Sequence, residues 1–443
     1  MDMNNKTTVG AVSLGCSKNR VDTEEILGEL TARGFVAVGD PAEAEVLLIN
    51  TCGFIESAKT DSLDTVFEMA QYKANGLCRL LVVCGCLSER YLDELRDELV
   101  EADIIWGVKD HAGLADAIVQ RLTGETPESF GCSKSSGRVL TTPPHRAYLR
   151  IADGCDNRCT YCAIPLIRGG RVSYPMEQLV KEAEGLAESG VTELTVIAQD
   201  TSAYGIDLYG EPKLAELLKR LAAIEKLHWV RLLYTYPNTV DEALIDTILS
   251  EPKICNYIDM PIQHINDELL KSMNRHGSAE HIRCITDYIR KASPEFILRT
   301  TAIVGFPGET EEQFEELLSF LKEHPYDRVG AFTYSSEEGT PAAKMPNQIP
   351  LKVMQRRYDK LMRMQMGVSL AANKRRVGTV VEVLVDDIDL DKGVALCRSY
   401  AEAAEVDGFI KVKLEGCGDV KQGDYITVRI TGAQYYDLTA ERV

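Results

Sequence analysis

The sequence lacks the features of an exported or membrane-spanning chain. Its first residues, MDMNNKTTVGAVSLG, hold no basic stretch followed by a long apolar run, and no window approaches the roughly 18 apolar residues of a membrane span. Basic residues are also in deficit, because 49 Lys and Arg stand against 68 Asp and Glu, a formal net charge of −19. Such a charge opposes binding to a phosphate backbone and favours basic partners, although a local basic groove can survive within it. We therefore expect a soluble, cytoplasmic protein with no membrane partner.

Cysteine is the residue type that carries chemistry in this sequence. The chain has 13 cysteines, an odd number, and no export features, so metal or redox chemistry is favoured over a disulfide framework. Cys155, Cys159 and Cys162 are spaced as C-x₃-C-x₂-C within DGCDNRCTYCAIP. Three thiolates with no fourth ligand nearby suit a [4Fe–4S] cluster that leaves one iron open to a small molecule. A zinc site and buried structural cysteines are the alternatives.

Hydrophobic periodicity predicts an α/β multidomain protein, beginning with a domain over residues 1–122. This segment alternates apolar runs with helical patterns, which is typical of a parallel sheet with helices packed on it. One helix is expected from Asp22 to Leu30, with Asp22 and Glu25 forming a capping box. The strands of this domain are therefore expected to be parallel.

The rest of the chain divides into a linker and two further domains. Residues 123–143 are rich in Gly, Ser, Thr and Pro, as linkers are. Residues 144–373 hold six strand-like runs separated by helical patterns, which predicts a partial (β/α)₆ barrel. Residues 374–443 change to the short runs TVVEVLVD, GVALCRSY, GFIKVKL and DYITVRITGA, broken by Gly and Asp, and this pattern predicts a small β-barrel.

A second set of cysteines lies in the first domain. Cys16, Cys52 and Cys86 each follow an apolar run, in SLGC, INTC and CGC. If those runs are parallel strands, their carboxyl ends meet at one edge and the three thiols converge there. Cys84 competes for the same role, but its place inside the strand makes it more suitable as a core thiol. Three convergent thiols imply a second cluster with a second open iron.

The cysteine loop, with Tyr161 before its third cysteine, resembles the radical S-adenosylmethionine (radical SAM) superfamily. Several segments resemble, over nearly the whole chain, the methylthiotransferases of that superfamily: SLGCSKNRVDTE, INTCGFIESAK, GCLSERY, AYLRIADGCDNRCTYCAIPLIRG, IDMPIQH and AFTYSSEEGTPA. The resemblance implies an N-terminal cluster domain, a radical SAM barrel and a C-terminal TRAM barrel. It also implies two [4Fe–4S] clusters and two molecules of S-adenosylmethionine, one giving a methyl group and the other a radical.

The resemblance also implies ligands for these cofactors. It assigns an auxiliary cluster to the cysteines of the first domain and the radical cluster to those of the barrel loop. Gln199 and Asp200, at the end of a strand, are expected to bond S-adenosylmethionine. Gly305 and Gly308, in RTTAIVGFPGET, are expected to let the backbone approach its adenosine, or else to serve only a strand-to-helix turn. No catalytic side chain is identified.

Two branches of the family differ in substrate. One modifies adenosine in tRNA, and the other modifies the β-carbon of an aspartate in a small-subunit ribosomal protein. Residues 374–443 hold 10 Lys or Arg and 13 Asp or Glu, a net charge of −3, which suits a basic protein better than RNA. The segments SKNRVDTE, SSEEGTPA and EAAEVDG also resemble the ribosomal-protein branch. We therefore expect a basic small-subunit ribosomal protein, free or within the ribosome, as the partner.

Two alternatives remain beside that expectation. One is the same reaction on tRNA adenosine. The other is a non-catalytic iron–sulfur or zinc module that docks on the ribosome. For an enzyme of this kind the resemblance also implies an electron donor such as flavodoxin or ferredoxin.

Overall fold

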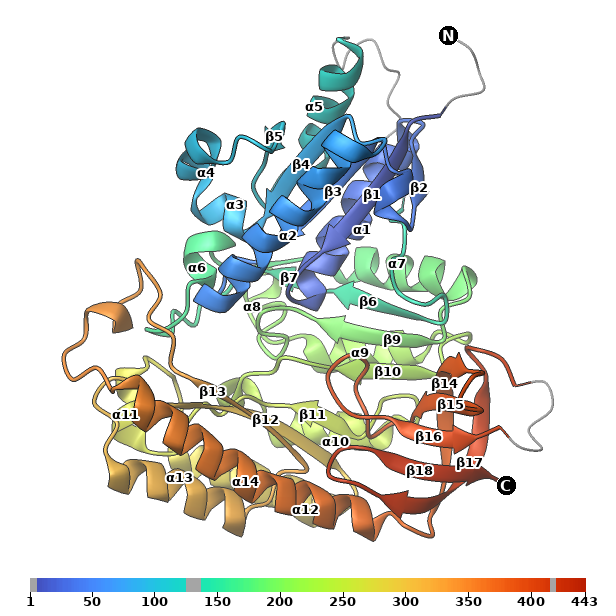
Figure 1. The fold of residues 1–443 in the computed structure, drawn as a ribbon. Coiled ribbons are helices and arrows are strands. Elements are labelled where there is room, and N and C mark those ends of the chain that lie inside the picture. The colour runs from blue at the N-terminus through green and yellow to red at the C-terminus, as the bar shows by residue number, and fades with distance from the viewer. Residues whose placement is uncertain (1–5, 125–136, 415–419) are drawn as a thin grey trace.

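A computed structural model describes residues 6–124, 137–414 and 420–443, which form three parts (Figure 1). The N-terminal part is a parallel sheet in the order β2-β1-β3-β4-β5. Its elements are β1 (Thr8–Ser13), α1 (Ser17–Ala32), β2 (Val36–Val38), the 3₁₀ turn η1 (Pro41–Glu43), β3 (Val46–Thr51), α2 (Glu56–Asn75), β4 (Leu80–Gly85), α3 (Cys86–Arg90), α4 (Leu92–Glu98), β5 (Ile104–Ile105) and α5 (His111–Thr123).

Helices cover both faces of this sheet. Leu48 of β3 packs in a cluster with Ile26 of α1 and Leu114 of α5, whereas the neighbouring Leu47 packs in a cluster with Val66 of α2. Every residue of β3 and β4 is therefore buried, as expected for strands with two covered faces. The carboxyl ends of β1, β3 and β4 therefore lie together at one edge of the sheet.

The central part is the predicted partial (β/α)₆ barrel. Its six principal strands form two parallel sheets, β6-β9-β10 and β11-β12-β13, and a parallel bridge between Val230 and Ile254 joins them. Its elements are β6 (Arg146–Arg150), β7 (Ala152–Asp153), α6 (Ile164–Ile167), β8 (Val172–Ser173), α7 (Met176–Glu188), β9 (Glu193–Ile197), α8 (Ile206–Tyr209), α9 (Leu214–Ala222), β10 (Trp229–Leu232), η3 (Pro237–Thr239), α10 (Glu242–Ser250), β11 (Tyr257–Asp259), α11 (Asp267–Ser272), α12 (Ala279–Ala292), β12 (Ile297–Val304), α13 (Glu311–Glu323), β13 (Arg328–Thr333), η4 (Ala342–Lys344) and α14 (Leu351–Arg375).

The C-terminal part is a closed barrel in the order β14-β15-β16-β18-β17. Its strands are β14 (Val380–Asp389), β15 (Val394–Arg398), β16 (Ile410–Lys413), β17 (Tyr425–Ala433) and β18 (Leu438–Arg442). Four of them coincide with the apolar runs in the sequence. The fifth, β18, was not predicted, because its sequence LTAER buries only Leu438 and Ala440. The α/β organisation with a small β-barrel is thus confirmed.

One helix start differs from the prediction. Helix α1 begins at Ser17 with Cys16 as its N-cap, so the expected start at Asp22 with a capping box is wrong. Asp22 and Glu25 lie within the helix and both accept hydrogen bonds from Arg150 of β6. Acidic residues that looked like a cap therefore serve a contact between two parts of the fold, which the local sequence does not reveal.

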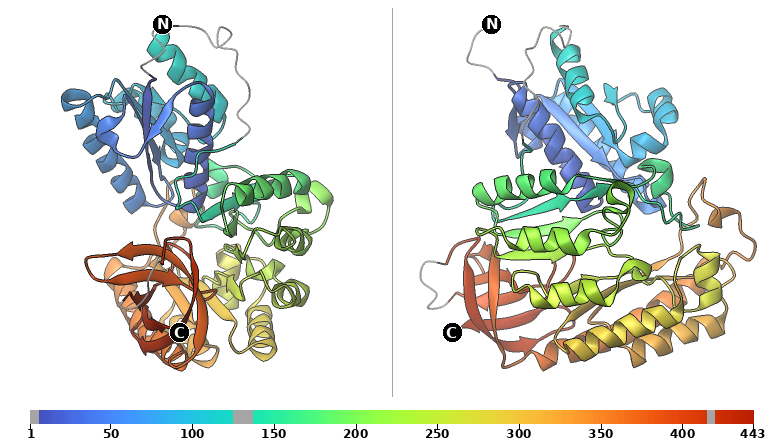
Figure 2. Two further views of the ribbon diagram at one scale, coloured as in Figure 1. Left: turned by 90° about the vertical axis from the view of Figure 1, so that its right-hand side faces the viewer. Right: turned by 180° about the vertical axis from the view of Figure 1, so that it is seen from behind.

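The three parts are arranged around the barrel strands. In Figure 1 the N-terminal sheet stands above β6 and α6, while the five-stranded barrel lies beside the right-hand ends of β9 and β10. Figure 2 shows the same arrangement from two further sides. No helix within the described residues has the length and apolarity to span a bilayer. Residues 125–136 of the expected linker lie outside the described residues, and the domain boundaries remain predictions.

Candidate metal centres

The structure brings Cys16, Cys52 and Cys86 to one edge of the N-terminal sheet. Cys16 follows β1, Cys52 follows β3, and Cys86 begins α3 directly after β4. These strands are adjacent and parallel, so their carboxyl ends meet. The Cys86 thiol interacts electrostatically with both other thiols. The convergence expected from the sequence is therefore present in the fold.

Two glycines shape the turns that carry these thiols. Gly85, which precedes Cys86, has φ +98°, and an added Cβ would lie 2.1 Å from Asn50 Oδ1. Gly15 has φ +84°, and an added Cβ would lie 2.8 Å from Cys52 Sγ. Only glycine combines this backbone conformation with so little space. Both turns are thus built for close approach at the thiol edge.

Burial raises the pKa of two of these thiols. It raises the pKa of Cys86 to about 12, and the Arg168 guanidinium beside it acts in the opposite direction. Burial also raises the pKa of Cys52. Such thiols keep their protons at neutral pH until a metal displaces them. The competing thiol, Cys84, packs in the apolar cluster between β4 and α1, and burial raises its pKa far above the usual range.

Cys155, Cys159 and Cys162 lie in the loop that follows β7, near the carboxyl end of the first barrel strand. Two backbone hydrogen bonds hold the loop, from Cys155 N to Gly169 O (3.1 Å) and from Cys162 N to Cys159 O (3.0 Å). In β/α barrels this end of the strands carries the chemistry. The fold therefore places the three thiols where a barrel enzyme keeps its reactive groups.

Polar side chains surround the barrel thiols. Asn157 Nδ2 donates to Cys155 Sγ at 3.5 Å and to Asp200 Oδ2 at 2.8 Å. Arg275 Nη1 lies 4.0 Å from Cys159 Sγ. These donors are suited to sulfurs that carry negative charge as metal ligands.

The barrel thiols are protonated and are not gathered in the geometry of a closed zinc site. Burial raises the pKa of Cys155 to about 11 and that of Cys162 to about 12, so both thiols keep their protons at neutral pH. Within the described residues, no three cysteine sulfurs lie within 4.8 Å of one another. A single zinc ion with Zn–S bonds of about 2.3 Å would hold its sulfurs about 3.8 Å apart. A closed zinc site is therefore not preformed among the described cysteines.

Gln199 and Asp200 follow β9, at the same end of the barrel as the thiols. Gln199 Nε2 donates to Asp153 Oδ1 at 3.0 Å, while Gln199 Oε1 is buried without a hydrogen-bond partner. Both oxygens of Asp200 accept hydrogen bonds from the chain itself, from Asn157 and from Ser202. Gln199 thus has an acceptor oxygen with no partner in the chain, whereas both oxygens of Asp200 already accept hydrogen bonds from it.

Gly305 and Gly308 both adopt left-handed backbone after β12, with φ of +78° and +82°. An added Cβ at Gly305 would lie 2.3 Å from Met354 Cγ, and Gly305 N donates to Glu309 Oε2 at 2.5 Å. Nothing lies within 4 Å of a Cβ added at Gly308. The packing of α14 against the turn therefore accounts for Gly305, and the space beside Gly308 remains open.

Two strained residues at the barrel mouth were missed by sequence reasoning. Tyr234, after β10, has φ +62°, and Gln263, after β11, has φ +66°. Such conformations cost about 1–3 kcal/mol in residues other than glycine and gather at functional sites. Lys18 Nζ of α1 lies 3.1 Å from the centre of the Tyr234 ring, and Gln263 Oε1 is buried without a hydrogen-bond partner. Gln263 lies within the motif segment IDMPIQH, but nothing in the sequence marks its backbone conformation or that of Tyr234.

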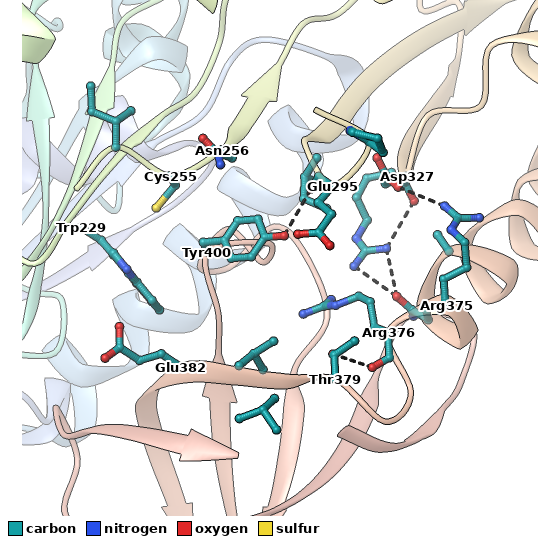
Figure 3. Close-up of a pocket in the computed structure, with 18 of the residues that line it drawn as sticks. Trp229, Cys255, Asn256, Glu295, Asp327, Arg375, Arg376, Thr379, Glu382 and Tyr400 are labelled. Carbon is teal, nitrogen blue, oxygen red and sulfur yellow. Dashed lines mark hydrogen bonds and ion pairs between the residues drawn. The ribbon is translucent and has the colours of Figure 1, made fainter. Parts of the chain in front are cut away.

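A cavity of 640 Å³ lies away from both sets of thiols (Figure 3). It is lined by Trp229, Ile297 and Arg328, at the amino ends of their strands, and by Arg376 and Tyr400 next to the C-terminal barrel. Barrel chemistry belongs to the opposite, carboxyl ends. This cavity is therefore not the candidate site.

Comparison with known families divides the chain in the same way as the fold. Residues 149–321 match the Radical SAM superfamily, residues 8–107 match the uncharacterized protein family UPF0004, and residues 377–443 match the TRAM domain. Curated relatives include the ribosomal protein uS12 methylthiotransferase RimO of Desulforamulus reducens, 45% identical over 98% of this chain and 99% of that protein. The protein of the same name from Geobacter sulfurreducens is 44% identical over 99% of both chains.

Solved structures share the fold at low identity. The radical S-adenosylmethionine methyltransferase TsrM from Kitasatospora setae, with cobalamin and a [4Fe–4S] cluster bound, has a TM-score of 0.54 at 15% identity, covering 76% of this chain and 77% of that one. The cobalamin-dependent radical enzyme OxsB has a TM-score of 0.51 at 12% identity, covering 82% of this chain and 56% of that one. These likenesses concern the architecture alone.

Proposed function

Because this chain belongs to the RimO family of radical S-adenosylmethionine methylthiotransferases, we propose that it adds a methylthio group to the β-carbon of an aspartate in ribosomal protein uS12. The observation that carries the proposal is the pair of three-cysteine sets, one at the sheet edge and one at the barrel mouth, in a chain aligned with such relatives over nearly its full length. The tRNA alternative is not favoured, since these relatives are named for uS12.

Membership of the Radical SAM superfamily implies S-adenosylmethionine and a [4Fe–4S] cluster. Cys155, Cys159 and Cys162 would hold this cluster. When bound, the pair of cofactors supplies a carbon radical able to remove a hydrogen atom from an unactivated carbon. The chain contributes a half-buried loop, fixed by its own hydrogen bonds, and the donors of Asn157 and Arg275 beside the sulfurs. These groups orient the reactants and limit the access of water.

A second cluster is proposed at the edge of the N-terminal sheet. Cys16, Cys52 and Cys86 would hold it and leave one iron open for the sulfur that is to be transferred. Two observations support this assignment: the thiols converge at the carboxyl ends of adjacent parallel strands, and Gly85 and Gly15 keep the turns tight. This cluster is the part of the proposal that distinguishes sulfur insertion from other radical chemistry.

The strand ends of the barrel would bind S-adenosylmethionine. Gln199, whose Oε1 lacks a partner, can accept from the amino group of the cofactor. The open space at Gly308 suits an approach by adenosine, whereas Gly305 is explained by packing. We propose that Asp200 acts indirectly, by holding Asn157 and with it the cysteine loop.

Charge supports a basic protein substrate. The whole chain carries a formal charge of −19, and its last 70 residues, 374–443, carry −3. Complementary charge speeds encounter with a basic ribosomal protein and opposes binding to RNA. We propose that uS12 is met in the cytoplasm, free or within the ribosome, and that a donor such as flavodoxin or ferredoxin supplies the electrons.

Mass spectrometry of uS12 tests the reaction. Purified chain, reconstituted anaerobically with iron and sulfide, is incubated with uS12, S-adenosylmethionine, sulfide and a strong reductant. The expected result is the replacement of one hydrogen by one methylthio group, located by fragmentation on an aspartate. The matched control is the same chain with Cys52→Ala, which should give no methylthiolated uS12.

The other outcomes separate the alternatives. Cleavage of S-adenosylmethionine to 5′-deoxyadenosine without modified uS12, but with methylthiolated tRNA, would replace the substrate and keep the chemistry. No cleavage at all, with the electron paramagnetic resonance (EPR) signal of the cluster unchanged by S-adenosylmethionine, would establish a non-catalytic iron–sulfur module instead.

A further inference from the structure

Arg168 joins the two sets of thiols. It follows α6, close behind the barrel cysteine loop, and its side chain is 1% exposed. Nη2 donates to Asn19 Oδ1 at 2.7 Å and to Asp22 Oδ2 at 2.6 Å, and it lies 3.6 Å from Cys86 Sγ. Nη1 donates to Asp153 Oδ1 at 3.2 Å. A residue of the barrel part thus reaches a thiol of the N-terminal part.

The contacts continue on both sides of the guanidinium. Asn19, fully buried, accepts from both Arg168 and the Cys86 thiol, the latter at 3.2 Å. On the barrel side, Asp153 also accepts from Gln199 Nε2 at 3.0 Å. A continuous line of side chains therefore runs from the sulfur of Cys86 to Gln199. The planar fork of arginine can meet partners on both sides at once, which a lysine ammonium cannot.

Holding the two parts together does not require a cation at Cys86. Arg150 of β6 already bonds Asp22 and Glu25 of α1, and His111 Nδ1 lies 3.0 Å from Glu25 Oε2. Although burial raises the pKa of Glu25, Arg150 and His111 lower it to about 2. No contact joins Arg150 to a cysteine of either set within the described residues. Arg150 thus provides docking alone, and Arg168 adds contact with a thiol.

We propose that Arg168 is a positioning residue that stabilises the reduced form of the cluster at Cys16, Cys52 and Cys86, and that holds Cys86 in register with Asp153 at the barrel mouth. This inference rests on the proposed function, since it requires a cluster at those thiols. A buried cation that donates to a ligand sulfur favours the more negative, reduced cluster and so raises its reduction potential. Removal of the cation should lower that potential.

The experiment isolates the cluster of the N-terminal part. In the full-length chain, Cys155, Cys159 and Cys162 are all replaced by Ala, so that only the other three thiols can bind a cluster. This parent is reconstituted anaerobically with iron and sulfide, its iron and sulfide are counted, and its midpoint potential is measured by redox titration followed by EPR. The same measurements are made with Arg168→Gln or with Arg150→Gln added.

Arg168→Gln is expected to lower the midpoint potential by about 59 mV or more, which is a tenfold shift in the one-electron equilibrium. Arg150→Gln is expected to leave the potential near that of the parent. Equal shifts in both variants would assign the effect to docking and overturn the proposal, as would no shift in either. If Arg168→Gln fails to fold, Arg168→Lys keeps the cation without the fork. Its potential should stay near that of the parent, and a fall of about 59 mV or more would overturn the role of the charge.

The same experiment tests the premise separately. If the parent binds no iron beyond a variant that also carries Cys52→Ala, the second cluster of the proposed function fails, whatever Arg168 does. If the parent binds four irons and its midpoint potential does not change when Arg168 is replaced, the cluster assignment is retained and only the role of Arg168 fails.

Discussion

Replacing Glu193 by glutamine should loosen the C-terminal barrel from the central one. Glu193 of β9 is fully buried and accepts from Arg231 Nε (2.9 Å) and from Arg398 Nη1 and Nη2 (3.0 and 2.6 Å). Arg398 belongs to β15, and both guanidiniums are also fully buried. Although burial raises the pKa of Glu193, the two arginines hold it well below its usual range. The carboxylate is therefore ionised at neutral pH.

The loss of unfolding free energy in Glu193→Gln comes from the two buried arginines that the substitution leaves without their carboxylate. Glutamine keeps the size of the side chain but removes the negative charge between two buried cations. Breaking a buried ion pair in this way costs about 3–5 kcal/mol. Asp386 still accepts from Arg398 Nη2 at 2.8 Å, so we expect the low end, about 3 kcal/mol. The matched control, Glu188→Gln, removes an ion pair with Lys226 that is more than half exposed and should cost at most about 1 kcal/mol.

Urea unfolding at neutral pH measures both variants, made in a Trp106→Phe background. Circular dichroism follows the whole chain, and tryptophan fluorescence follows Trp229, which lies beside Tyr425 of the C-terminal barrel. The expected result is that Glu193→Gln unfolds at a lower urea concentration than the unchanged chain, with the change in fluorescence coming first. Glu188→Gln should unfold at nearly the same urea concentration as the unchanged chain. The reasoning is refuted if Glu193→Gln unfolds at the same urea concentration as Glu188→Gln.

Three further predictions concern the thiols, a turn and pH. Cys159→Ala should abolish cleavage of S-adenosylmethionine, whereas Cys52→Ala should leave cleavage uncoupled from sulfur insertion. Chromatography of 5′-deoxyadenosine measures the cleavage, and mass spectrometry of uS12 measures the insertion. Methylthiolated uS12 from either variant would contradict the prediction. Gly85→Ala should lower the unfolding free energy by about 1–3 kcal/mol and reduce bound iron, because the backbone has positive φ and the Cβ has no space. Gly34→Ala, which has positive φ but open surroundings, is the control and should keep its iron. Glu25 has a folded pKa near 2, below its unfolded value, so its contribution to stability is present above about pH 4.5 and disappears as the pH falls toward 2. Urea midpoints of Glu25→Gln and the unchanged chain should therefore converge on acidification, and a constant difference would contradict the assignment.

Much of the fold is predictable because the apolar pattern repeats along the chain. Strands buried on both faces, such as β3 and β4, read as continuous apolar runs, and the barrel alternates such runs with amphipathic helices. The pattern fails where few residues are buried, as in β18, and where polar residues serve a distant partner, as Asp22 does in α1. The membership of the radical methylthiotransferases inferred from motifs is confirmed by the full-length relatives.

The candidate site was predictable in part. Cys155, Cys159 and Cys162 are close in sequence, so their spacing alone predicts a shared ligand. The convergence of the other three thiols could be inferred only through the assumption of parallel strands, which the fold satisfies. Tyr234 and Gln263 could not be found, because their strained backbone depends on surrounding structure and not on residue type.

The sequence by itself determined the family and the order of the three parts and predicted six thiols as metal ligands, because these depend on local spacing and periodic burial. Only the tertiary structure decided that Arg168 lies against Cys86 and Asp153 at once, and that Gln199 Oε1 has no partner while both oxygens of Asp200 do. Partnerships between buried polar groups are set by which elements pack together, and side chains far apart in sequence then satisfy or leave unsatisfied each other's hydrogen bonds.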